Sequence, residues 1–185
     1  LHLAFMSINL KKDDVIILPI INFIAASNLA TMLQAKIYYA DVCPNTGQMT
    51  PETLEACIKK NKLKNIKAVV IMYLGGNPDN IKSFYYLKKK YKFYLLEDAC
   101  HALGSKYIYN GRVHNVGSCI HSDICVFSLH PLKTITSGEG GIVTTNNLNI
   151  FNRLMKLKNS GIDRKNYNKK INFPHWLYDV KYPGL

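Results

Sequence analysis

The sequence predicts an α/β protein, a three-layer sandwich in which helices cover both faces of a mainly parallel central sheet. Apolar runs of strand length alternate along the chain with segments whose apolar residues recur at helical spacing. Runs such as residues 68–74 carry no polar residue at alternate positions, which is typical of a strand covered on both faces. Alternating strand and helix patterns favour parallel strands joined by helices. With 185 residues, of which 48% are hydrophobic, the chain suffices for one domain with a sizeable core.

The first half of the chain alternates helix and strand. Residues 1–8 read as the middle of an apolar helix with no capping residue before them, so we expect the chain to be cut from a longer one. A strand over residues 15–18 ends at a proline, and small and apolar residues at helical spacing predict a helix over residues 22–34. The next strand, 37–42, runs into a turn-rich stretch. The helix after it begins at Pro51, behind a threonine cap.

The second half continues the alternation. A Gly-Gly-Asn-Pro turn follows the strand at 68–74, and an amphipathic helix begins at Ile81. Three lysines lie at the C-terminal end of that helix, where the helix dipole favours cations. The buried strand 93–96 runs directly into a Glu-Asp pair, and the apolar run 124–127 ends in Ser-Leu-His-Pro. Polar and chemically active residues therefore follow two of the predicted strands.

The net charge of +12 raises nucleic acid as a partner. However, the basic residues are spread over helix faces, and no arginine-led patch interleaved with aromatic residues occurs. We therefore expect no nucleic-acid partner. A basic field that attracts a phosphorylated small substrate and an ordinary solvated surface both remain open. No segment approaches the roughly 18 apolar residues of a membrane span, and none resembles a signal peptide, so we expect a soluble, cytoplasmic protein with no membrane partner.

The five cysteines form an odd set without a Cys-x-x-Cys pair, which favours a reducing compartment. His114, Cys119, His121 and Cys125 lie close together in the sequence, and all are residue types that bind zinc. Their spacing matches no common zinc module, and buried free cysteine is frequent. We therefore expect no metal site.

Two chemically active segments follow predicted strands, and ligands of such sheets bind beyond the carboxyl ends of the strands. One segment begins at Asp98, which can also serve simply as a cap for the turn that follows. The other ends at Lys133, a lysine without charged neighbours in the sequence. A lysine held just past a strand can be desolvated, lose its proton and form a Schiff base with a carbonyl. An ordinary loop lysine is the alternative.

The two segments suit one cofactor chemistry. If Lys133 forms an imine with an aromatic aldehyde cofactor, an anion is needed to keep the pyridine nitrogen protonated, and Asp98 is of the right type. Ser128 can supply a hydroxyl to a phosphate from the same turn as Lys133. His101 and Phe23 can lie flat against the ring.

The same residues carry a resemblance. The run Glu-Asp-Ala-Cys-His-Ala-Leu-Gly-Ser from Glu97, the run Phe-Ser-Leu-His-Pro-Leu-Lys that ends at Lys133, and the Gly-Glu-Gly-Gly that begins at Gly138 occur in this order. Together they resemble the DegT/DnrJ/EryC1/StrS family of sugar aminotransferases, over residues 15–145. The resemblance implies the large-domain architecture of aspartate aminotransferase, which is pyridoxal-phosphate fold type I, and pyridoxal 5'-phosphate as cofactor.

The resemblance also implies roles for five residues. Lys133 is the Schiff-base lysine and the proton carrier, and Asp98 is the partner of the pyridine nitrogen. Ser128 is a phosphate ligand. His101 and Phe23 contact the ring.

The reaction implied by the resemblance moves an amino group from an amino acid, glutamate, to a nucleotide-linked 4-keto-6-deoxy sugar. The Asp-Ala-Cys-His-Ala-Leu-Gly-Ser run favours members that make surface-glycan amino sugars such as pseudaminic acid, with the legionaminic and perosamine-type members as alternatives. A sugar dehydratase of the same family is a further alternative, although such members typically carry histidine in place of the lysine. A degenerate relative that binds a ligand without turnover is another. We expect a homodimer with a shared active site.

Some parts expected from the resemblance lie outside this chain. Family members carry a phosphate-binding turn before the helix that begins here at Leu1. They also receive a segment from the partner subunit that would follow Leu185, and they have a C-terminal small domain. We therefore expect residues 1–185 to be a fragment of the pyridoxal-phosphate-binding large domain, without the N-terminal segment and the small domain.

Overall fold

A six-stranded sheet forms the centre of the computed structural model, which describes residues 1–163 and 178–185. Five neighbouring strands run parallel, and the last runs antiparallel to its neighbour. In spatial order the strands are β2 (Lys36–Ala40), β1 (Val15–Pro19), β3 (Ile66–Met72), β4 (Tyr94–Asp98), β7 (Ile124–Ser128) and β8 (Gly141–Thr144). The prediction of a mainly parallel α/β sheet is confirmed.

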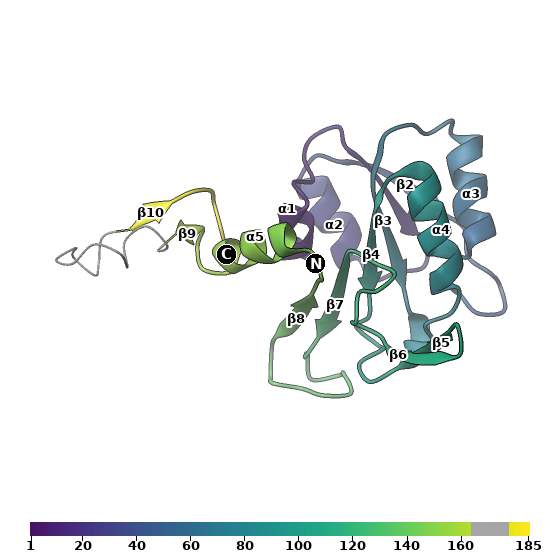
Figure 1. Cartoon of the computed structure of the whole chain (residues 1–185). Coiled ribbons are helices and arrows are strands. Elements are labelled where there is room, and N and C mark those ends of the chain that lie inside the picture. Colours follow the sequence, from purple (N-terminus) through teal and green to yellow (C-terminus); the bar gives the residue numbers. More distant parts are fainter. Residues whose placement is uncertain (164–177) are drawn as a thin grey trace.

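Helices cover both faces of this sheet, so the molecule has three layers (Figure 1). The strands show why both faces need cover: in β3, Val69 and Ile71 pack into one buried core, whereas Ala68 and Val70 pack into the other. One core also takes Leu54 and side chains of neighbouring helices. The helices of that layer are α3 (Pro51–Lys60) and α4 (Ile81–Tyr91), and those of the opposite layer are α1 (His2–Ser7), α2 (Ala25–Met32) and α5 (Leu148–Leu157).

Helix α3 begins where the sequence predicts. The Thr50 side chain accepts the Thr53 N–H at 3.3 Å, and the Thr53 side chain accepts the Thr50 N–H at 3.0 Å. Two backbone donors that no helical carbonyl could reach are therefore satisfied. Pro51 occupies the first turn, where its missing N–H costs nothing. The apolar face carries Leu54 and Ile58, both buried.

The turn after β3 depends on a glycine. The 3₁₀ turn η1 (Leu74–Gly76) ends at Gly76, whose φ is +84°. A Cβ on Gly76 would lie 2.6 Å from the His101 carbonyl oxygen, a contact that no side chain could tolerate. The Ser105 hydroxyl donates to the Gly76 carbonyl oxygen at 2.7 Å. The segments that follow β3 and β4 are thereby held together.

Some elements were not anticipated from the sequence. They are helix α5, strand β8, the hairpin β5 (Lys106–Tyr109) and β6 (Arg112–Asn115), and the short pair β9 (Ile162–Asp163) and β10 (Asp179–Val180). The hairpin turns at Asn110 and Gly111, which have φ of +48° and +71°. An Asn-Gly pair of this kind is the usual signal for a tight hairpin turn. Among the described residues, no helix combines the length and the apolar character that crossing a membrane requires.

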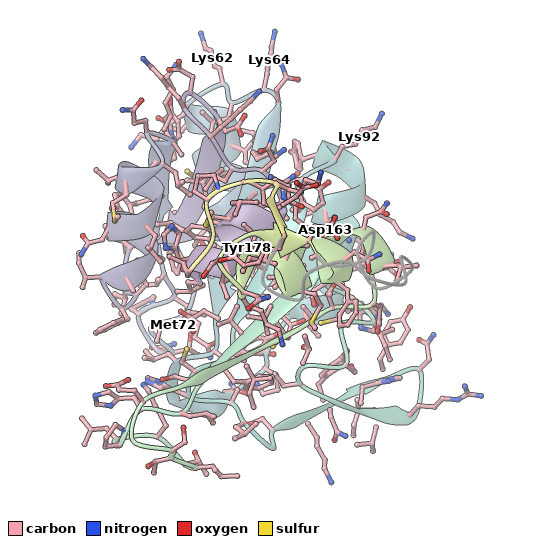
Figure 2. The ribbon with its side chains drawn as sticks, turned by 90° about the vertical axis from the view of Figure 1, so that its left-hand side faces the viewer. Lys62, Lys64, Met72, Lys92, Asp163 and Tyr178 are labelled. Carbon is pink, nitrogen blue, oxygen red and sulfur yellow. The ribbon has the colours of Figure 1, made fainter. Side chains whose placement is uncertain are left out.

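The two edges of the sheet differ in charge. We call the edge where β1, β3, β4 and β7 end the carboxyl edge, and the opposite one the amino edge. Figure 2 shows Lys62, Lys64 and Lys92 projecting at the end of the molecule opposite to Met72, the last residue of β3. Helices α3 and α4 end at the amino edge, and lysines in the last turns of both complement the helix dipoles there. These lysines therefore lie away from the edge that carries the two chemically active segments.

Candidate functional site

Asp98 and the lysine segment leave the sheet on adjacent strands. In the register of β4 and β7, Asp98 lies opposite Val126, and the pairing continues past the strand, since Ala99 donates its N–H to the Val126 carbonyl at 2.9 Å. On the other side, Tyr73 donates its N–H to the Asp98 carbonyl at 3.1 Å. Asp98 is therefore held between β3 and β7, and its side chain is only 3% exposed.

The Asp98 carboxylate does cap the turn that follows, because its Oδ1 accepts the Cys100 N–H at 3.2 Å. Its charge also acts on neighbouring groups. Burial raises the pKa of the Cys100 thiol to about 12, the negative charge of Asp98 adds to the shift, and the positive charge of Lys133 acts against it. The carboxylate, the thiol and the lysine therefore share one electrostatic neighbourhood.

Lys133 stands in a closed loop between β7 and β8 (Figure 1). Leu129 donates its N–H to the Gly140 carbonyl at 2.9 Å, and Ser137 donates to the Leu129 carbonyl at 3.0 Å. A Cβ on Gly140 would lie 2.6 Å from the Ser137 hydroxyl, so the glycine lets the chain return this closely. Lys133 is half-buried, whereas Leu132 beside it is 86% exposed. The loop therefore shelters the lysine and leaves its apolar neighbour in solvent.

Ser128 ends β7 at the mouth of this loop. Its Oγ accepts the His130 N–H at 3.3 Å. The hydroxyl proton of Ser128 is not used in that bond, so it remains available to an acceptor such as a phosphate oxygen.

His101 and Phe23 lie at the carboxyl edge with exposed side chains. His101 follows Asp98 in the turn after β4. Phe23 is 67% exposed in the connection between β1 and α2, and β3 lies between β1 and β4 in the sheet. Of the predicted site residues, Asp98 and Ser128 therefore end adjacent strands, and Lys133 lies in the loop that follows Ser128. His101 follows Asp98 in the turn after β4, and Phe23 follows β1, two strands away.

Comparison with known proteins identifies the family. The sequence model of the DegT/DnrJ/EryC1/StrS aminotransferase family matches residues 1–179. The chain belongs to this family.

Three similar proteins indicate the kind of enzyme to which the chain is related. The chain is 36% identical, over 165 residues, to UDP-4-amino-4,6-dideoxy-N-acetyl-beta-L-altrosamine transaminase of Campylobacter jejuni subsp. jejuni serotype O:23/36 (strain 81-176). That alignment covers 89% of this chain and 42% of the relative. The solved aminotransferase from Psychrobacter cryohalolentis superposes with a TM-score of 0.84 at 26% identity, over 99% of this chain and 44% of that one. Helicobacter pylori PseC, an aminotransferase of pseudoaminic acid biosynthesis, gives a TM-score of 0.79 at 25% identity, over 99% and 45%. The chain spans less than half the length of these relatives.

Cys100 is a neighbour of Asp98 and Lys133 that the sequence motifs do not reveal. All five cysteines are unpaired in the structure. The signal was the position of Cys100 two residues after Asp98, where a tight turn brings its N–H and thiol back to the carboxylate.

Glu97 points to the other face of the sheet from Asp98, because successive side chains of a strand alternate. It is 2% exposed, and its Oε2 has no hydrogen-bond partner among the described residues. Burial raises the pKa of Glu97, while the nearby side chains of Ser122, Cys125 and Tyr73 act in the opposite direction. The Glu-Asp pair therefore contributes one carboxyl group to each face of the sheet.

Two of the four residues considered as zinc ligands, Cys119 and His121, have other partners. The Cys119 thiol donates to the Thr144 carbonyl at 3.3 Å, and His121 Nδ1 lies 2.9 Å from the Tyr107 hydroxyl. Cys125 is fully buried in the core, where burial raises the pKa of its thiol. In the parts of the chain that the structure describes, no group of three or more His, Cys, Asp or Glu side chains is arranged to hold a metal ion.

Proposed function

We propose that this chain forms the cofactor-binding part of a pyridoxal-phosphate-dependent aminotransferase that moves an amino group from glutamate to a nucleotide-linked 4-keto-6-deoxy sugar. One observation carries the proposal: the buried Asp98 and the half-buried Lys133 follow adjacent parallel strands and share one electrostatic neighbourhood. Membership in an aminotransferase family supports the reaction class.

The residues at the carboxyl edge suit pyridoxal phosphate. When bound, this cofactor supplies an aldehyde that accepts amino groups and a ring that withdraws electrons once its nitrogen is protonated. Asp98 offers an anion in a buried position, where it would hold that ring proton strongly. Ser128 offers a hydroxyl donor for the phosphate. His101 and Phe23 offer rings at the same edge that can pack against the faces of the cofactor.

The proposed work of Lys133 is to anchor the cofactor and to move a proton. Its Nζ would take a proton from the α-carbon of the amino-acid donor in the first half of the reaction. In the second half it would deliver a proton to the carbon of the sugar that receives the amino group. One amine can serve as base and then as acid, because the proton that it takes up in one step is given up in another.

The substrate proposal rests on the relatives. The Campylobacter jejuni relative is named for a UDP-linked amino sugar, and the Helicobacter pylori relative belongs to pseudoaminic acid biosynthesis. By inference from them, this protein would aminate a UDP-linked 4-keto-6-deoxy sugar on the way to a surface-glycan amino sugar such as pseudaminic acid. The legionaminic and perosamine-type sugars are the competing substrates.

We further propose that the complete site includes residues outside this chain and from a second copy. The chain would be a fragment of the large domain, because it spans less than half the length of its relatives. Exposed apolar side chains at the carboxyl edge support a shared homodimeric site, since large exposed apolar patches mark interfaces. They include Ile20, Ile21, Phe23 and Ile24. Five free cysteines support a reducing compartment, the cytoplasm.

The test is amino transfer by the full-length protein supplied with pyridoxal phosphate, glutamate and the UDP-linked keto sugar. The expected product is an amino sugar, detected by mass spectrometry, with 2-oxoglutarate formed in equal amount. A product that has lost a hydroxyl without gaining nitrogen would support the dehydratase alternative. Cofactor binding without turnover on any of the three sugar classes would support a degenerate relative.

A further inference from the structure

A cavity of about 520 Å³ lies at the amino edge of the sheet. Asp98 and Lys133 lie at the carboxyl edge, at the other end of the strands. It is bounded by the end of α1, by α5 and by the starts of β3 and β4. The residues that give it chemical character are Asn9, Lys67, Tyr94, Asn149, Arg153 and Tyr182. No role in the proposed reaction involves this cavity.

Two cations face the cavity without a carboxylate partner. Arg153 donates from one terminal nitrogen to Asn9 Oδ1 at 3.1 Å, while its buried Nε has no hydrogen-bond partner among the described residues. Lys67 Nζ lies 5.5 Å from the centroid of the Tyr94 ring. Over residues 1–163 and 178–185, no Asp or Glu lines the cavity or forms an ion pair with either cation. The terminal nitrogens of Arg153 and the Nζ of Lys67 are therefore the charged donors that an anion in the cavity would meet without breaking an ion pair.

Both cations are oriented by aromatic rings. The guanidinium carbon of Arg153 lies 5.4 Å from the centroid of the Tyr182 ring, and Lys67 is held in the same way over Tyr94. Lys156, which also lines the cavity, is already paired with Asp163 at 2.6 Å. The unpaired positive charge therefore belongs to Lys67 and Arg153, whose head groups are already restricted before any ligand arrives.

Neutral donors complete the lining. Helix α5 begins beside the cavity, with the Asn147 side chain accepting the N–H groups of Asn149 and Ile150. The Asn149 and Asn152 amides can donate to an anion.

We propose that this cavity binds a phosphate group, either free or as the phosphate of a small organic ester. A planar guanidinium, a primary amine and amide donors around one space match the several acceptor oxygens of a phosphate. The volume of about 520 Å³ leaves room for an organic group attached to it. The site is independent of the proposed aminotransferase site, because the two lie at opposite edges of the sheet.

The test is isothermal titration of the purified full-length protein in phosphate-free buffer, with inorganic phosphate in one arm and ribose 5-phosphate in the other. Lys67→Gln and Arg153→Gln should each weaken binding at least tenfold, since each removes a charge-assisted bond. Lys64→Gln is the matched control: it removes the same charge from an exposed lysine just before β3 that does not line the cavity, and it should change the dissociation constant less than twofold.

Arg153→Gln also removes the bond to Asn9 and can lower stability, so Lys67→Gln is the deciding variant. Ser128→Ala separates the two edges, because phosphate bound here should survive it. The proposal is overturned if neither 10 mM inorganic phosphate nor 10 mM ribose 5-phosphate binds. It is also overturned if the Lys67→Gln protein binds these ligands as tightly as the wild type does. It is equally overturned if Ser128→Ala abolishes the titrated binding. None of these readouts uses enzyme activity, so they are separate from the test of the proposed function. Tighter binding of ribose 5-phosphate than of inorganic phosphate would identify an ester as the ligand.

Discussion

Asp98→Asn tests whether this carboxylate acts by its charge or only as a turn cap. Asparagine has nearly the same shape and keeps an oxygen that can accept the Cys100 N–H, so the turn after β4 should survive. What the substitution removes is the negative charge of a side chain that is 3% exposed. The two roles of Asp98 are thereby separated in one variant.

The expected magnitude follows from burial. A pair of opposite charges about 4 Å apart at an effective dielectric constant of about 20 interacts by about 4 kcal/mol. That energy corresponds to about three pKa units on the ring nitrogen of a bound pyridoxal phosphate. Without Asp98 the nitrogen would lose its proton near neutral pH, and the turnover number should fall by about a thousandfold while cofactor binding persists. The pKa of the Cys100 thiol should fall as well, because the charge of Asp98 contributes to raising it.

The assay is amino transfer at saturating cofactor, together with the rate of Cys100 alkylation as a function of pH. Asp79→Asn is a matched control, since Asp79 is an exposed aspartate whose Oδ1 accepts the Asn80 N–H at 2.9 Å. It should leave both measurements unchanged. If Asp98→Asn turned over within tenfold of the wild type, Asp98 would be a turn cap and nothing more.

Three further predictions concern chemistry and stability. Lys133→Ala should lower amino transfer by at least about four orders of magnitude; after borohydride treatment, mass spectrometry should find no cofactor attached to the chain, and an attached cofactor would contradict the assignment. Asp123→Ala should lower the free energy of unfolding by about 3 kcal/mol. Asp123, whose side chain is 15% exposed, pairs with Lys88, whose side chain is 23% exposed, at 2.8 Å, and it also accepts the backbone N–H of Leu95 in β4. In the same denaturant titration Asp13→Asn, which breaks an exposed pair with Lys36 and tolerates the positive φ of this position, should lose less than about 1 kcal/mol, and equal losses would refute the burial argument. Burial raises the pKa of Glu97 above its ordinary value of 4.5, so the folded state holds this proton more tightly than the unfolded state, and stability falls as pH rises above that value. Glu97→Gln should therefore flatten the fall in melting temperature between pH 5 and pH 8, and an unchanged slope would mean that Glu97 is not its source.

The elements that the sequence predicted correctly are those with a strong local signal. Helix α3 begins at Pro51 behind the Thr50 cap, and β3 and β4 are buried apolar runs. Strand β8 lacked such a signal, because Gly141 and Ile142 are exposed and their pairing with β7 comes from a distant part of the chain. The β5–β6 hairpin does carry a local signal, because the Asn-Gly pair at residues 110–111 favours a tight hairpin turn.

The candidate site divides in the same way. Asp98 and Lys133 could be predicted because each follows a buried strand, and parallel strands that are neighbours end at one edge. That Cys100 returns to the carboxylate depends on the turn geometry, which the sequence does not determine. That the two strands are neighbours depends on the order of strands in the sheet, in which β7 lies beside β4 although the β5–β6 hairpin separates them along the chain. The roles of all five predicted site residues, Asp98, Lys133, Ser128, His101 and Phe23, stay predictions.

The direction of the strands explains where the charges of this protein lie. Helices α2, α3 and α4 each follow a parallel strand, so they begin at the carboxyl edge and end at the amino edge. Their positive dipole ends thus favour anions at the carboxyl edge, and lysines gather at the ends of α3 and α4. Helix α5 follows β8, the antiparallel strand of the described sheet, and therefore begins at the amino edge. The reversal of one strand brings the N-terminus of α5 and Arg153 to the edge where Lys67, at the start of β3, and other lysines already lie, which favours a second anion site there. Binding at that edge should therefore weaken with rising salt more steeply in the wild type than in the Lys67→Gln protein, because less positive charge would remain to be screened in the variant.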